Sequence, residues 1–157
     1  MKTVTPEKYI KPSRFMKFEV GENIVRVVSD IYLYEKYGLR AAGRYLSQII
    51  WEGQKINPLF SKQDPKKKWG FICWSYKHEE FKVIETGPTL GDALANLLKS
   101  DAEYKNKDIV VHRVGTTKND TKYQVDFSEK NSDTPERTPA MEANFQAVAE
   151  YFKKPKE

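Results

Sequence analysis

The sequence has few residues that could bind a metal or form a disulfide. Cys73 is the only cysteine among 157 residues, and His78 and His112 are the only histidines. A single cysteine excludes an internal disulfide and also a zinc site built from cysteine pairs. We therefore expect no metal and no cofactor.

Long hydrophobic runs are also missing. No apolar stretch approaches the roughly 20 residues that a membrane-spanning helix needs. Residues 1–14 lack the apolar segment of a secretory signal. Charged residues make up 31% of the chain, as in proteins with a well-hydrated surface. We expect a cytoplasmic protein with no membrane partner.

Common enzyme motifs are absent as well. The chain has no Walker-type phosphate loop, no HExxH and no paired-acid signature. His112 has no accompanying Ser, Cys or carboxylate motif, and Cys73 is interpreted as a small core residue, so neither is a candidate for catalysis. A nuclease would need clustered acids to hold metal ions, and none occur at a suitable spacing. We expect a protein that is not an enzyme.

Aromatic residues are what the chain has in excess. Three Trp, nine Tyr and eight Phe make up 13% of the residues. Most should fill a β-rich core, but aromatic faces also stack on unpaired bases. Lys and Arg outnumber Asp and Glu by 27 to 22. The net charge of +5 permits a polyanionic partner without requiring one.

Apolar alternation and β-branched residues predict strands over much of the chain. A turn at residues 21–23 is expected after a first β-segment, and residues 45–51 fit either a strand or a helix. Residues 53–68 contain Asn-Pro, Asp-Pro and three lysines, and are expected to form a long loop. The other predicted β-segments are residues 15–20, 24–28, 31–40, 69–76, 81–86, 109–114 and 123–127.

Two amphipathic helices are predicted. Thr89 with Asp92 three residues later is a capping box, and the leucines that follow share one face. Thr138 and Pro139 open the second helix, and its apolar stripe consists of Met141, Phe145, Val148 and Phe152.

The order of these elements predicts an all-β to α+β fold. It fits a single five-stranded OB-type Greek-key barrel with one helix between strands 3 and 4 and a C-terminal helix. We expect the barrel to span residues 15–130, after a flexible N-terminal arm at 1–14. Residues 131–157 would form a linker and the C-terminal amphipathic helix.

Five segments carry a resemblance to a known family. They are Gly21-Glu-Asn with residues 25–28, the aromatic strand 69–76, and residues 81–86, 107–115 and 121–125. In this order they resemble the single-stranded DNA-binding proteins of tailed bacteriophages, of the OB type without zinc. The resemblance implies a protein that coats and protects single-stranded DNA without sequence preference in the host cytoplasm. It also implies roles in phage DNA replication, recombination and repair, with possible partners among the replication or recombination proteins.

Candidate DNA-binding residues combine cations with aromatic rings, which a single-strand channel needs. Alternation along residues 69–76 places Trp74 and Tyr76 on the face opposite Phe71 and Cys73, and we expect that face to line the groove. A core position for Trp74 remains open. The full predicted set is Tyr34, Lys36, Tyr37, Arg40, Arg44, Lys66, Lys67, Lys68, Trp69, Trp74, Tyr76, Lys77, Arg113, Lys118 and Lys122.

Two further hypotheses concern protein contacts. The chain could be a protein-interaction module of a phage replisome or virion with no direct DNA binding, in which the aromatics are core. The C-terminal helix could also mediate self-association, because the polar linker at residues 131–135 gives it reach.

Overall fold

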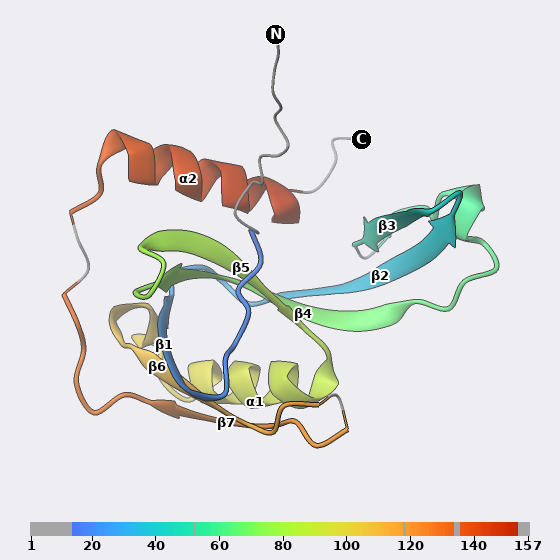
Figure 1. Cartoon of the computed structure of the whole chain (residues 1–157). Helices are drawn as coiled ribbons and strands as arrows, with labels where there is room; N and C mark the ends of the chain where they lie inside the picture. The colour runs from blue at the N-terminus through green and yellow to red at the C-terminus, as the bar shows by residue number, and fades with distance from the viewer. Residues whose placement is uncertain (1–13, 52, 118, 134–135, 154–157) are drawn as a thin grey trace, which may run out of the picture.

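Seven β-strands form one antiparallel sheet with a helix on each side (Figure 1). The computed structural model describes residues 14–51, 53–117, 119–133 and 136–153. The N-terminal arm expected at residues 1–14 lies outside this part of the chain, apart from Arg14. Among the described residues, neither helix has the length and apolar character needed to span a membrane.

The elements follow one another along the chain with two helices in the second half. The strands are β1 (Gly21–Val27), β2 (Tyr32–Ala41), β3 (Arg44–Ile50), β4 (Lys66–Ser75), β5 (Glu80–Thr86), β6 (Ile109–Val114) and β7 (Lys122–Phe127). The helices are α1 (Pro88–Lys99) and α2 (Pro139–Ala149). Short 3-10 helices are η2 (Pro58–Phe60), η3 (Tyr104–Asn106) and η4 (Glu150–Phe152).

Strand β4 is the centre of the sheet. Its first residues pair with β2 and its last residues with β1 along one edge, whereas β5 pairs along the other edge. Strand β1 also pairs with β6, and β6 with β7. The strand order therefore runs β5-β4-β1-β6-β7, with the β2–β3 hairpin attached to the first half of β4.

The sheet is not closed into a barrel, because no pairing joins β5 to β7. The edge of β5 is instead covered by the segment before β1. The backbone N–H of Met16 donates to the carbonyl of Val83 at 2.7 Å, and the Val83 N–H donates to the carbonyl of Arg14 at 2.7 Å. From the same segment, Phe18 packs against Tyr123 of β7, with ring centroids 6.3 Å apart. The prediction of a five-stranded barrel is therefore wrong in strand number, and the described strands form an open sheet instead of a barrel.

Three local predictions need correction. Residues 21–23 start β1 rather than forming a turn, because the Asn23 side chain bonds backbone groups of Glu19 and Val111 while its backbone pairs with β6. Helix α1 has Gly87, not Thr89, at its N-cap, since Pro88 occupies the first helical position that proline favours. The lysines at 66–68 lie in β4, and residues 45–51 belong to strand β3 up to Ile50.

Side chains of β4 alternate between two cores. Phe71 and Cys73 point into the core shared with α1, and burial raises the pKa of the Cys73 thiol to about 12. Ile72 and Trp74 point into the core shared with α2. The predicted parity of this strand is therefore correct, and both of its faces are buried.

Helix α2 packs on the sheet of its own chain, above β5 and β4 (Figure 1). Thr138 caps it as predicted, by accepting from the N–H of Met141. The Asn144 side chain accepts from the backbone N–H of Phe81 at 2.6 Å and donates to the carbonyl of Phe81 at 3.5 Å. These contacts provide hydrogen-bond partners for the backbone of β5 at the part of its edge that residues 14–16 do not reach.

Candidate nucleic-acid interface

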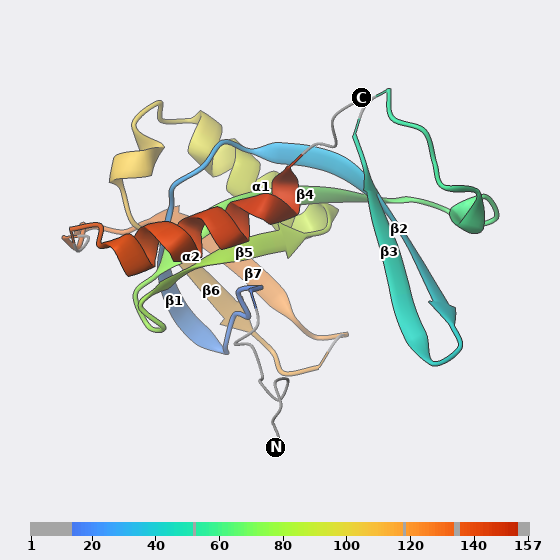
Figure 2. The ribbon, with the colours of Figure 1, turned by 90° about the horizontal axis from the view of Figure 1, so that it is seen from above.

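The β2–β3 hairpin and the loop after it project from the rest of the sheet (Figure 2). We call residues 32–68 the β-arm. It consists of β2, β3, the connection that contains η2, and the first three residues of β4. A small cluster of its own, built on Tyr37, Ile50 and Phe60, holds the loop against one face of the hairpin.

The β-arm carries the entire net charge of the protein. It contains eight of the 27 Lys and Arg but only three of the 22 Asp and Glu, so its excess of five equals the +5 of the whole chain. A projecting segment with this excess concentrates positive potential where a polyanion can reach it. The basic residues are Lys36, Arg40, Arg44, Lys55, Lys62, Lys66, Lys67 and Lys68.

One face of the hairpin presents an exposed aromatic ring. Tyr45 is 58% exposed and lies directly opposite Arg40 in the β2–β3 register. Its ring end lies over Gly38, where an added Cβ would come within 2.1 Å of the Tyr45 hydroxyl oxygen. Glycine at this position therefore lets the tyrosine lie against the strand and leaves its outer side accessible. A cation beside an accessible ring is the combination that stacks on an unpaired base and contacts its phosphate.

Two of the three lysines at the start of β4, Lys66 and Lys68, extend the face of Arg40 and Tyr45 across the neighbouring strand, whereas Lys67 lies on the opposite face with Glu35. Lys66 lies opposite Lys36 and Lys68 opposite Tyr34 in the β2–β4 register. Lys66 and Lys67 are exposed, and Lys68 is half-buried. The Lys67 ammonium also lies 5.3 Å from the centroid of the Trp69 ring, a cation–π contact.

A largely buried carboxylate, Glu85, anchors the base of the β-arm to β5 and to η4. Glu85 accepts from Tyr34 at 2.6 Å, from Lys36 at 2.7 Å and from the Tyr151 hydroxyl. Burial by itself would raise the pKa of Glu85, but the hydrogen bonds from Lys36, Tyr151 and Tyr34 outweigh it and hold this pKa below its ordinary value. Burial and the Glu85 carboxylate raise the pKa of both tyrosine hydroxyls. Tyr34 and Lys36 therefore have a structural role here.

Replacing Glu85 by Gln is expected to lower the free energy of unfolding by about 3 kcal/mol at pH 7, because it leaves the Lys36 charge without its partner. The lowered pKa of Glu85 makes its contribution complete above the ordinary value of 4.5, and the contribution is lost as pH falls below it. Urea unfolding at pH 7 and near pH 3 should show that the difference in free energy of unfolding between wild type and E85Q is smaller in acid. A difference that stays constant with pH would contradict the assignment.

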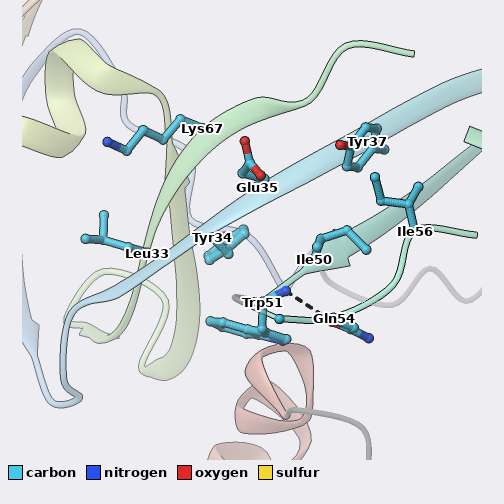
Figure 3. A pocket seen from close by; sticks show the side chains of 10 residues that line it. Leu33, Tyr34, Glu35, Tyr37, Ile50, Trp51, Gln54, Ile56 and Lys67 are labelled. Atoms are coloured by element: carbon cyan, nitrogen blue, oxygen red, sulfur yellow. Dashed lines mark hydrogen bonds between the residues drawn. The ribbon is translucent and has the colours of Figure 1, made fainter. Parts of the chain in front are cut away.

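A pocket of about 600 Å³ lies at the base of the β-arm (Figure 3). Strands β2 and β3, the start of the following loop and Lys67 of β4 form its walls. The backbone N–H of Trp51 donates to the Gln54 side-chain oxygen at 3.1 Å, which closes the loop on one side. The lining combines apolar side chains with one carboxylate, one amide and one ammonium group.

Comparisons with known protein families, curated proteins and solved structures found no match. The residues themselves thus carry the functional argument. In the described part of the chain, no three His, Cys, Asp or Glu side chains gather as a metal site would require.

Most of the predicted aromatic contacts are buried. Tyr34, Tyr37, Trp69 and Trp74 are each less than 9% exposed. Trp74 is 3% exposed because α2 covers it, and its ring packs against Phe81 with centroids 4.9 Å apart. Trp74 is therefore a core residue, which is the alternative that the sequence left open. None of the four rings can stack on a base without rearrangement.

The predicted cations are divided between the β-arm and other parts of the sheet. Arg40, Arg44, Lys66 and Lys67 are exposed on the β-arm, together with the half-buried Lys68. Lys122 is exposed on β7, at the opposite end of the strand order from β3. Lys118 lies outside the described residues.

Three other predicted residues make contacts within the protein. The Tyr76 hydroxyl donates to Asp108 at 2.7 Å, and the Arg113 guanidinium donates to the Phe18 carbonyl at 2.7 Å. Lys77 forms an exposed ion pair with Glu19. Their hydrogen bonds and ion pair join elements of the body of the sheet rather than the β-arm.

Sequence reasoning missed Tyr45. The signal was present as a glycine at 38, an arginine at 40 and the Arg44-Tyr45 pair across a Gly-containing turn. Because residues 45–51 fit either a strand or a helix, the sequence alone does not indicate the cross-strand pairing of Arg40 with Tyr45.

Proposed function

We propose that the protein binds single-stranded DNA through the β-arm. The observation that carries this proposal is that the whole net charge lies on the projecting β-arm, beside the exposed ring of Tyr45. Phosphates provide the sequence-independent part of affinity, and an accessible ring adds stacking that only unpaired bases allow.

The strand order supports an OB-type relationship. If the inserted hairpin is set aside, β1, β4, β5 and β6 lie in the order β6-β1-β4-β5, which is the 4-1-2-3 arrangement of a Greek key. Helix α1 lies between the third and fourth of these strands, and β7 follows as the fifth. OB folds are often only partly closed. We therefore propose an open OB-type sheet in which residues 14–18 replace the closing pair.

The position of the β-arm fits this proposal. OB folds bind oligonucleotides on the face of their second and third strands and on adjoining loops, including the loop between strands 1 and 2. In this chain α2 covers the corresponding face of β4 and β5, whereas the β-arm is an insertion between β1 and β4. The binding surface is thus shifted onto the insertion.

Binding only the unpaired form would protect single strands and shift the melting equilibrium of hairpins by mass action, with no cofactor or catalysis. Together with the family resemblance, this supports a role in coating DNA during phage replication, recombination or repair in the host cytoplasm. Replication proteins and self-association through α2 remain proposed partners. Self-association would require α2 to leave the core that it shares with β5.

The test is a titration of fluorescently labelled oligo-dT, single-stranded and as a duplex with oligo-dA, at two salt concentrations. We expect strong preference for the single strand and weaker binding at higher salt. Anisotropy of the label is the suitable signal, because Trp51, Trp69 and Trp74 are buried. Equal affinity for the duplex would contradict the preference for single strands, and no binding at low salt would favour a protein-interaction module.

Replacing Tyr45 by Ala should weaken oligo-dT binding by roughly tenfold, since stacking on one base contributes about 1–3 kcal/mol. Thermal stability should change little, because the ring is exposed. Tyr45→Phe should retain most of the affinity. The matched control is Leu59→Ala, which removes a 53% exposed side chain from η2 of the same β-arm. Equal effects of the two alanine variants would contradict a stacking role.

A further inference from the structure

We propose that the pocket at the base of the β-arm holds one nucleobase that carries an exocyclic amino group. This inference rests on the proposed function and adds a base preference at one position of an otherwise sequence-tolerant strand. Three observations carry it: the apolar walls, the polar groups that face the space, and the position of the pocket beside the lysine cluster.

The walls suit a flat aromatic ligand. Leu33 and Tyr37 of β2, Ile50 of β3 and Ile56 of the loop supply apolar surface. Leu33 and Ile56 are 50% and 43% exposed, so the apolar lining is open to an incoming group (Figure 3). A volume of about 600 Å³ lies in the range of small-ligand pockets and admits a purine or a pyrimidine.

The polar groups of the pocket are few and differ in kind. No side chain in the described part of the chain pairs with the Glu35 carboxylate. The Gln54 side-chain oxygen accepts from the N–H of Trp51 at 3.1 Å, so its NH₂ group remains the donor of that amide. Lys67 lies directly opposite Glu35 in the β2–β4 register.

A carboxylate selects bases by what their edges donate. It accepts from the amino group of cytosine, adenine or guanine. Thymine has no amino group, and its two carbonyl oxygens flank its single ring N–H, so they would face the negative charge. Glu35 therefore favours an amino-bearing base over thymine.

The place of the pocket connects it to the strand path. Lys67 belongs both to the lining and to the lysine cluster of β4. A phosphate bound by this ammonium would lie at the rim of the pocket. The nucleotide that follows can then turn its base toward Glu35.

The experiment compares a labelled dT 12-mer with the same oligonucleotide carrying one central dC, dA or dG. For wild-type protein we expect the substituted strands to bind roughly tenfold tighter, the factor that one hydrogen bond to a charged group supplies at an exposed site. Glu35→Gln should remove this preference, because its NH₂ group can donate to a thymine carbonyl, so that the dT strand gains affinity and the substituted strands lose their advantage.

A second variant tests the space itself. Ile56→Trp should fill the pocket and remove the preference, whereas Leu59→Trp, on the same loop but outside the lining, should keep it. Circular dichroism melts of both variants verify folding. If no oligonucleotide binds, the proposed function fails. If dT binds with the expected salt dependence but one amino-bearing base changes nothing, the pocket inference alone is overturned.

Discussion

Replacement of Lys66, Lys67 and Lys68 by alanine is expected to weaken binding of oligo-dT by about 100-fold at 0.1 M salt. Each phosphate contact contributes about 0.7 to the slope of log affinity against log salt for a single strand, so three contacts change the slope by about 2. The three residues start β4, with Lys66 and Lys68 on the face of Arg40 and Tyr45 and Lys67 on the opposite face. Anisotropy titrations between 50 and 300 mM salt, roughly a sixfold range, measure the slope directly.

The matched control removes the same charge elsewhere. Lys17, Lys99 and Lys130 are exposed lysines outside the β-arm. Their triple alanine variant has the same net charge as the β-arm variant but should lose little affinity and keep the wild-type slope. If both triple variants lose the same slope, binding depends on net charge alone and the β-arm is not the interface.

Replacement of Trp74 by Ala is expected to lower the free energy of unfolding by about 3–5 kcal/mol, the cost of removing a buried aromatic side chain. Trp74 is 3% exposed between β4 and α2 and packs edge-on against Phe81. For a chain of this size the melting temperature should fall by about 10 °C. Thermal and urea unfolding followed by circular dichroism give both quantities.

The same variant separates a core role from a DNA-binding role. At a temperature at which W74A is fully folded, its affinity for oligo-dT should equal that of the wild type, because α2 and not DNA covers this position. A stable W74A protein with impaired DNA binding would show instead that α2 leaves the face of β4 and β5 when DNA binds.

Local sequence patterns predicted the strands and helices better than they predicted whether the sheet closes into a barrel. Alternation correctly separated Phe71 and Cys73 from Ile72 and Trp74, and Thr138 with Pro139 correctly marked the start of α2. Closure is a long-range property, which depends on whether β5 pairs with β7. Here residues 14–16 and Asn144 occupy the edge of β5 instead, and no local sequence pattern in β5 indicates its partner.

The basic residues of the candidate site could be predicted from the sequence, but which aromatic rings are accessible could not. Lysine runs and the arginines near residue 40 stay on the surface because their hydration is costly to remove, and the exposed Arg40 and Lys66 follow this rule. Aromatic residues can be core or platform, and the choice depends on what packs over them. Helix α2 covers Trp74, whereas Tyr45 lies over a glycine and is 58% exposed. Only the tertiary arrangement distinguishes the two.

The covering of β4 and β5 by α2 also has a consequence for biosynthesis. Of the described residues, those of α2 and η4 leave the ribosome last, although they cover strands that were made about 60 residues earlier. Until they emerge, the nascent chain presents Ile72, Trp74 and Phe81 as a bare apolar face. A chain truncated before Thr138 would contain all seven strands but would expose this apolar face and tend to aggregate. Chaperone binding to the nascent chain should be strongest before α2 emerges.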